Sequence, residues 1–108
     1  MDDATNDERC AAQLRAFGDP VRLRIVKCLQ AGEMTVSDVA EVLEIDLANA
    51  SHHLRSLKIS GLAVARRDGK FTYYSLDPAV HSRRPRSGES SFDLGCCRFV
   101  LPQESSEP

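Results

Sequence analysis

The chain has 108 residues and a formal net charge of −2, with 42% hydrophobic and 28% charged residues. This size and composition predict one soluble globular domain with a modest core. No apolar run is long enough to cross a membrane, which excludes a membrane-spanning protein. The acidic opening is untypical of a signal peptide, so we expect a cytoplasmic protein whose four cysteines are reduced.

Charge is distributed unevenly along the chain. Residues 1–46 contain ten acidic and five basic residues. Residues 47–86 contain eight Lys or Arg and two acidic residues, a net charge of +6 without histidines. A basic segment within an acidic chain predicts that any contact with nucleic acid occurs there.

The first half of the chain has the periodicity of short helices. Residues 1–7 are polar and expected to be flexible, as are residues 102–108. Apolar residues at steps of three and four predict a helix over 8–17. Asp19 followed by Pro20 predicts the start of a second helix over 20–31.

Two further helices are predicted close together. Thr35, with an acid three residues later, predicts a capping box and a helix that ends near residue 44. Asp46 is a good N-cap for the next helix, and Gly61 suits its end. In this helix Leu47, Ala50, Leu54, Leu57 and Ile59 form an apolar face. Two short helices joined by a tight connection form a helix-turn-helix pattern.

After Gly61 the pattern changes to the two-residue period of strands. In residues 62–67 and 71–76 the side chains alternate between two faces, as in strands. Asp68-Gly69 between them is a strong signal for a hairpin turn. A basic hairpin directly after a helix-turn-helix predicts a winged helix. The predicted fold class is therefore α+β, mainly helical, with about four helices and a β-hairpin wing within residues 8–80.

Several segments of the chain resemble the ArsR/SmtB family of bacterial metal- and metalloid-responsive repressors. The matching segments are residues 17–26, 35–43, 50–57, 61–62 and 66–76. The resemblance implies a homodimer that binds a palindromic operator in double-stranded DNA and places two copies of the 47–60 helix in successive major grooves. The implied DNA-contacting residues are Leu47, Ala48, Asn49, Ser51, His52, Arg55, Lys58, Arg66, Arg67 and Lys70. His53 is expected to pack inside the domain instead.

The chain departs from the family at its metal-sensing positions. Thr35 and Ser37 occupy the positions of a cysteine pair that many members use, so that site is absent. Asp77 and His81 are four residues apart, but one carboxylate and one imidazole cannot complete a zinc site. Residues 81–91 are predicted to be a polar, basic loop, and the C-terminal tail after it takes the place of the long final helix that other members use.

The remaining candidate for a sensor is the apolar tail over residues 92–101, expected to fold back on the body as a strand or strap. Cys96 and Cys97 offer soft thiolates for As(III), Cu(I) or Cd(II), and Cys10 from the partner's first helix would supply a third sulfur. They would alternatively form a redox switch, or merely pack as small hydrophobic side chains. Cys28 lies on an apolar helix face and is expected to pack.

No nucleophile–base arrangement and no phosphate-binding glycine loop is present, so we predict no enzymatic activity. The sequence predicts a DNA-binding repressor that a metalloid, metal or thiol-reactive effector releases from its operator. Two alternatives remain open: a constitutive DNA-binding regulator, and a winged-helix module that binds proteins.

Overall fold

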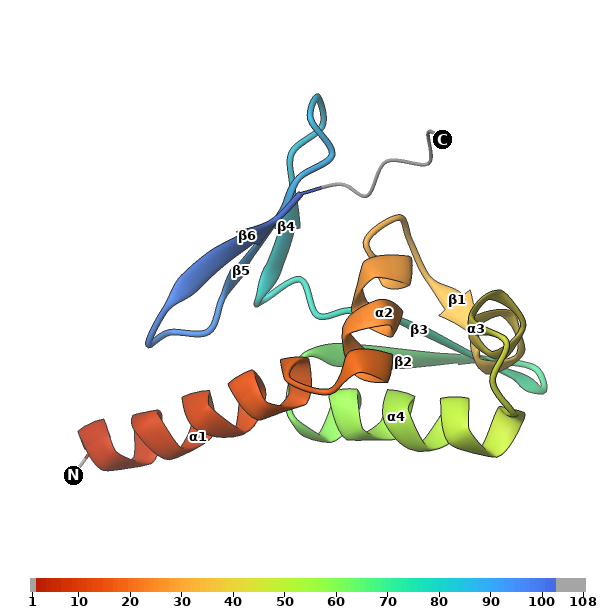
Figure 1. The fold of residues 1–108 in the computed structure, drawn as a ribbon, viewed down its shortest axis with the longest axis horizontal. Helices are drawn as coiled ribbons and strands as arrows, with labels where there is room; N and C mark the ends of the chain where they lie inside the picture. The colour runs from red at the N-terminus through yellow and green to blue at the C-terminus, as the bar shows by residue number, and fades with distance from the viewer. Residues whose placement is uncertain (1, 103–108) are drawn as a thin grey trace.

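The computed structural model describes residues 2–102, with side chains from residue 6 onward. Within that range the chain forms four helices and six short strands (Figure 1). Their bounds are α1 Asp2–Phe17, α2 Pro20–Leu29, β1 Met34–Thr35, α3 Val36–Leu43, α4 Leu47–Ile59, β2 Ala63–Asp68, β3 Phe71–Leu76, β4 His81–Arg83, β5 Ser90–Asp93 and β6 Arg98–Leu101.

The predicted helices are all present, and α1 is longer than expected. It begins at Asp2, whereas the sequence predicted a helix from residue 8. Residue 1 and residues 103–108, most of the second segment predicted to be flexible, lie outside the described residues.

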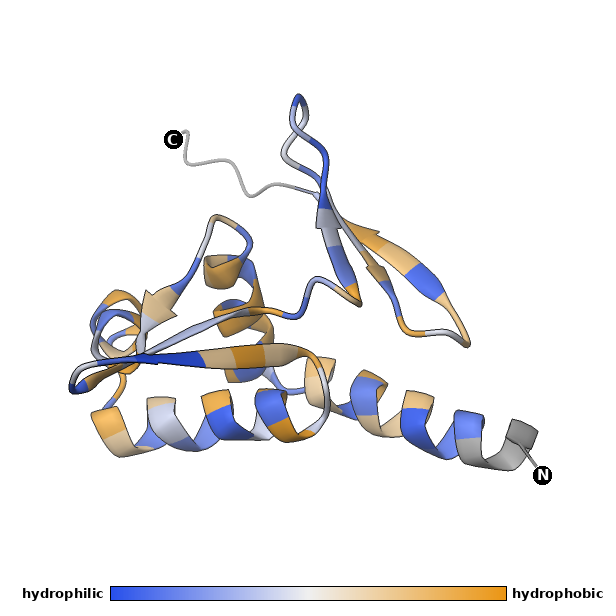
Figure 2. Cartoon of the chain, turned by 180° about the vertical axis from the view of Figure 1, so that it is seen from behind, coloured by the Kyte–Doolittle hydropathy of each residue, from blue (hydrophilic) through white to orange (hydrophobic). Residues whose placement is uncertain are grey.

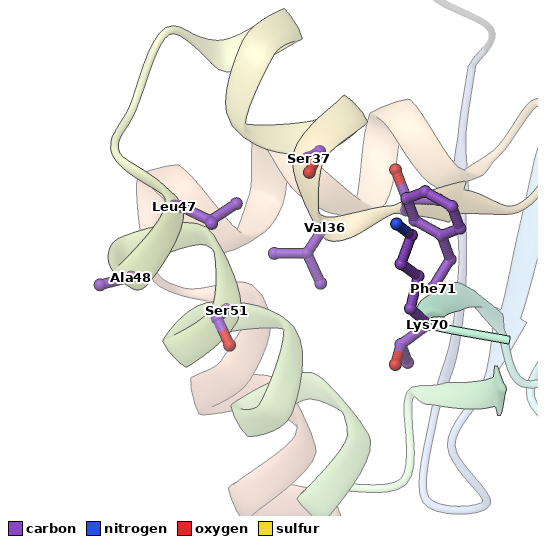
Figure 3. A pocket seen from close by; sticks show the side chains of 9 residues that line it. Val36, Ser37, Leu47, Ala48, Ser51, Lys70 and Phe71 are labelled. Carbon is purple, nitrogen blue, oxygen red and sulfur yellow. The ribbon is translucent and has the colours of Figure 1, made fainter.

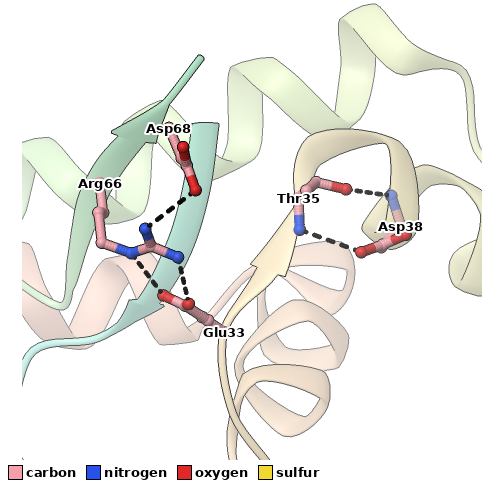
Figure 4. Close-up of polar contacts among 5 residues, drawn as sticks. All are labelled: Glu33, Thr35, Asp38, Arg66 and Asp68. Carbon is pink, nitrogen blue, oxygen red and sulfur yellow. Dashed lines mark hydrogen bonds and ion pairs between the residues drawn. The ribbon is translucent and has the colours of Figure 1, made fainter. Parts of the chain in front are cut away.

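The predicted caps are confirmed. The Asp19 carboxylate accepts a hydrogen bond from the Arg22 N–H at the start of α2. Thr35 and Asp38 form a reciprocal capping box at the start of α3, drawn in Figure 4. Helix α2 ends at Leu29, two residues before its predicted end.

The wing is a three-stranded antiparallel sheet in the order β1-β3-β2. The hairpin turns at Gly69 and Lys70, one residue later than predicted, because Asp68 still belongs to β2 and pairs with Phe71. Gly69 has a φ of 63° that suits glycine. Strand β1, which pairs Met34 with Tyr74, was not predicted from the sequence. At two residues β1 is too short to produce a periodic signal.

The core lies between the helices and the inner face of the wing, and it continues into the tail. Helix α4 contributes Ala50, Leu54 and Leu57, each with no exposed surface. Leu47 and Ile59 are 55% and 84% exposed, so their assignment to the apolar face is wrong. They are the first and the last residue of α4.

The tail forms a second antiparallel sheet in the order β4-β5-β6. The prediction of a loop over residues 81–91 is therefore wrong at both ends, where β4 and β5 pair His81 with Phe92 and Arg83 with Ser90. Periodicity is weak in strands of three and four residues, and the pairing depends on partners distant in sequence. Figure 2 shows apolar stretches along β5 and β6 and polar residues at the tip of the β4–β5 connection.

An aromatic cluster attaches the second sheet to α1. Phe92 is fully buried, and its ring centroid lies 5.2 Å from that of Phe17 on α1. Phe99 on β6 lies 5.0 Å from Phe17 and stacks on Phe92. The prediction that the tail folds back on the body is thus confirmed, with a sheet in place of a long final helix. None of the helices within residues 2–102 is both long and apolar enough to cross a membrane.

Candidate nucleic-acid interface and cysteine cluster

Helix α4 presents a polar face on the side opposite its buried residues. Asp46 caps the helix by accepting the Asn49 N–H at 2.8 Å. Asn49, His52 and Arg55 are exposed, each about one turn from the next along this face. These side chains can donate and accept hydrogen bonds at base edges, and helices of this kind fit a major groove.

The two adjacent histidines of α4 have different environments. His52 is exposed, whereas the His53 side chain is only 13% exposed and its Nδ1 lies 3.9 Å from an Asp19 carboxylate oxygen. Burial lowers the pKa of His53, and the charge of Asp19 opposes this shift. The expectation that His53 packs inside the domain is confirmed.

Other predicted contacts lie farther along α4 and at its start. Ser51 accepts a hydrogen bond from Arg55 at 2.9 Å, which holds the guanidinium along the helix. Lys58 lies exposed in the last turn. Leu47 and Ala48 are exposed in the first turn, at the end of the helix near the wing (Figure 1).

Of the three predicted wing cations, Arg66 is bound to an acidic residue, whereas Arg67 and Lys70 are exposed. The Arg66 guanidinium donates to both carboxylate oxygens of Glu33, at 2.6 and 3.3 Å, and lies 3.7 Å from Asp68 (Figure 4). It also lies over the Tyr73 ring, 4.6 Å from the centroid. The hydrogen bond from Arg66 lowers the pKa of Glu33. Arg66 therefore ties the wing to the loop before β1, and its predicted contact with DNA stays a prediction.

Arg67 and Lys70 are exposed at the tip of the wing. Among the described side chains, neither forms an ion pair. Their charges thus point outward without an internal partner, as the predicted contact with a phosphate backbone requires.

An open groove of about 560 Å³ lies between the start of α3, the start of α4 and the wing (Figure 3). Predicted contact residues Leu47, Ala48, Ser51 and Lys70 line it. Several other lining residues were not predicted from the sequence, because they come together only when the wing folds beside α3. These are Thr35, Val36, Ser37, Phe71 and Thr72.

At the other end of the molecule, three cysteines lie together. Cys10 on α1 and Cys96 in the β5–β6 turn form a disulfide with a Cα–Cα distance of 6.1 Å. Cys97 is a free thiol, and the three sulfurs lie within 4.8 Å of one another. Cys28 packs against the core as predicted.

The cluster corrects two expectations. Cys10 and Cys96 are oxidised rather than reduced, and Cys10 reaches the pair within its own chain rather than from a partner. Cys10 and Cys96 are 86 positions apart. The sequence did not predict the second sheet that brings Cys96 to α1, so it could not predict this pairing. In the reduced form, three such sulfurs suit a soft, thiophilic ion.

The comparisons with known proteins agree with this geometry. Residues 17–66 match the family described as a helix-turn-helix domain. A cadmium resistance transcriptional regulatory protein CadC homolog of Staphylococcus aureus is 47% identical over 68 residues, which cover 62% of this chain and 56% of that protein. A probable mercury resistance operon repressor of Streptomyces lividans is 34% identical over 101 residues, covering 89% of this chain and 81% of the repressor.

Among solved structures, the chain resembles the homodimeric winged helix-turn-helix DNA-binding domain Mb0332 from Mycobacterium bovis, a possible ArsR-family transcriptional regulator. The TM-score is 0.68 at 33% identity, and the match covers 70% of each chain. The fold is thus that of winged helix-turn-helix transcriptional regulators. The chain belongs to the ArsR/SmtB family, whose members are regulators rather than enzymes.

Proposed function

We propose that this protein is a cytoplasmic homodimer that represses transcription by binding a palindromic operator. The observation that carries the proposal is the continuous surface formed by the polar face of α4, the open groove and the outward cations of the wing. The base-facing residues are Asn49, Ser51 and His52, with Leu47 and Ala48 at the leading edge of the helix. Arg55, Lys58, Arg67 and Lys70 contact the phosphate backbone, and Arg66 supports the wing.

We further propose that the cysteine cluster receives the effector. The related proteins named for cadmium and mercury resistance point to thiophilic ions as its chemical class. In the reduced form, Cys10, Cys96 and Cys97 would provide three thiolates to As(III) or a soft metal ion.

The same sulfurs also allow an oxidative signal. When Cys10 and Cys96 form the disulfide, two thiols lose two protons and two electrons to an oxidant such as glutathione disulfide. The bonded sulfurs are then unavailable as thiolate ligands, so oxidation and ion binding exclude each other.

The test is a titration of the purified, reduced protein against DNA from its own promoter region at several salt concentrations. We expect tight, salt-sensitive binding that arsenite, cadmium or glutathione disulfide weakens. Binding that none of these alters would indicate a constitutive regulator, and absence of binding would favour a protein-interaction module. Loss of the effector response in Cys96→Ser/Cys97→Ser would tie the response to the cluster.

A further inference from the structure

Gln13 lies between the cysteine cluster and the recognition helix α4. It follows Cys10 by three residues, so the two side chains share one face of α1. Both are buried, at 2% exposure for Cys10 and 9% for Gln13. A buried amide is expected to have a hydrogen-bond partner, and the Gln13 Nε2 donates to the Ser60 carbonyl at 3.0 Å.

Ser60 is the C-cap of α4. The carbonyls of the last helical turn have no N–H donor within the helix, so the Gln13 amide supplies one from another element. The next residue, Gly61, has a φ of 83°, and a Cβ built on it would lie 3.2 Å from the Gln13 Nε2. Gln13 therefore lies directly against the turn in which α4 ends.

On its other side, α1 is fixed to the second sheet at two points. One is the packing of Phe17 against Phe92 and Phe99. The other is the disulfide between Cys10 and Cys96. Only the second can be made, broken or replaced by a bound ion, and it lies one helical turn from Gln13.

We propose that Gln13 is the positioning residue that transmits the state of the cysteine cluster to α4. Breaking the disulfide, or placing an ion among the three sulfurs, changes how α1 is held on the second sheet. Gln13 then shifts relative to Ser60, and the C-terminal end of α4 moves with it. Because α4 is about 20 Å long, a small rotation there displaces its base-facing end by a larger distance. This inference rests on the proposed function and names the residue through which the cysteine cluster would act on α4.

The first experiment measures amide hydrogen exchange at residues 60–62, without DNA. Dithiothreitol reduces the disulfide, giving Cys10 and Cys96 one hydrogen each while the reagent becomes a cyclic disulfide. We expect reduction to change exchange at these amides about fivefold or more in the natural sequence, the lower range of allosteric coupling. Gln13→Met keeps the length and apolar volume of the side chain but removes the donor, and it should abolish the change.

A matched control is available at the C-cap of α2. Gln30 is 8% exposed and its Nε2 has no hydrogen-bond partner, so Gln30→Met makes the same buried exchange without removing a bond. This variant should respond to reduction as the natural sequence does. If Gln13→Met does not fold, Gln13→Asn keeps the amide but shortens its reach, with the same expected loss. An unchanged response in the Gln13 variant, or no response in the natural sequence, overturns the inference.

The second experiment separates this inference from the proposed function. The affinity for promoter DNA is measured in the disulfide and dithiol states. The two affinities should differ in the natural sequence and become nearly equal in Gln13→Met. This result supports both the repressor function and the route through Gln13. If Gln13→Met keeps the full difference, the route through Gln13 is wrong while the repressor function stands. If the natural protein binds no DNA, the repressor function fails, and hydrogen exchange alone decides the coupling.

Discussion

The two ends of the molecule are built by different means. The wing end contains the start of α4, the groove and the hairpin tip, and its shape follows from helix caps, a two-residue turn and an ion pair between Arg66 and Glu33. The cysteine end is a sheet of three short strands, fixed by stacked aromatic rings and a disulfide. The caps and the turn of the first end are local signals, whereas its Arg66–Glu33 ion pair and the whole second end depend on contacts distant in sequence. We therefore expect the wing end to bind and the cysteine end to respond.

The largest effects should come from removing a buried side chain at either end. Phe92→Ala should lower the free energy of unfolding by about 3–5 kcal/mol, because the lost ring leaves a cavity where the second sheet meets α1. Effector response should be lost with it. Urea unfolding and DNA titration measure the two effects, and Val100→Ala, on an exposed residue of β6, is the control. Normal stability in Phe92→Ala would show that the rings do not attach the tail.

The corresponding change in the body is Leu54→Ala, in the fully buried face of α4. It should cost about 2–5 kcal/mol in the free energy of unfolding. Unlike Phe92→Ala, it should weaken DNA binding in every effector state, since it loosens the helix that presents the base contacts. An equal loss of effector response in both variants, at unchanged DNA affinity, would contradict the division between the two ends.

Base-contact variants should have the next largest effect and should act on binding alone. Asn49→Ala and His52→Ala should each weaken specific binding by about 10–100-fold, with unfolding unchanged, because both side chains are exposed. Binding to unrelated DNA should stay the same. Competition titrations measure this, and equal losses on both DNAs would argue that these residues contact phosphate.

Wing cations should change the salt dependence of binding. Arg67→Ala and Lys70→Ala should each reduce the slope of log affinity against log salt concentration by about one. Arg84→Ala, in the basic connection between β4 and β5, should leave the slope unchanged and serves as the charge-matched control. A reduced slope in Arg84→Ala would extend the DNA-binding surface to the cysteine end.

The smallest effect should be a pH dependence of stability with a contribution from each end. Burial lowers the pKa of His53 in the body and of His81 in the second sheet, where His81 bonds the Ser90 hydroxyl at 2.9 Å. The unfolded chain then binds more protons than the folded one just below the ordinary pKa of 6.5, so stability falls as the pH drops through this range.

Urea midpoints at pH 5.5 and 7.5 measure the pH effect. His53→Gln and His81→Gln should each reduce the difference between the two midpoints. The same difference in the double variant as in the natural sequence would mean that other groups cause it.

The sequence by itself determined the winged helix. Asp19, Thr35 and Asp46 each cap a helix through side-chain hydrogen bonds to backbone N–H groups three residues on, and such bonds are local. The hairpin turn is local in the same way, although it lies at Gly69-Lys70, one residue later than predicted. The exposed face of α4 also followed from sequence, because helical periodicity separates buried from exposed positions.

Only the tertiary structure decided the second sheet, the pairing of Cys10 with Cys96, the hold of Glu33 on Arg66 and the contact of Gln13 with Ser60. Each joins residues far apart in the chain, 86 positions for the disulfide and 47 for Gln13. No periodic pattern encodes such a pairing, since it forms only when separate elements pack. The exposed face of α4 therefore follows from local sequence, whereas the groove beside the wing and the link between sensor and surface form only in the folded chain.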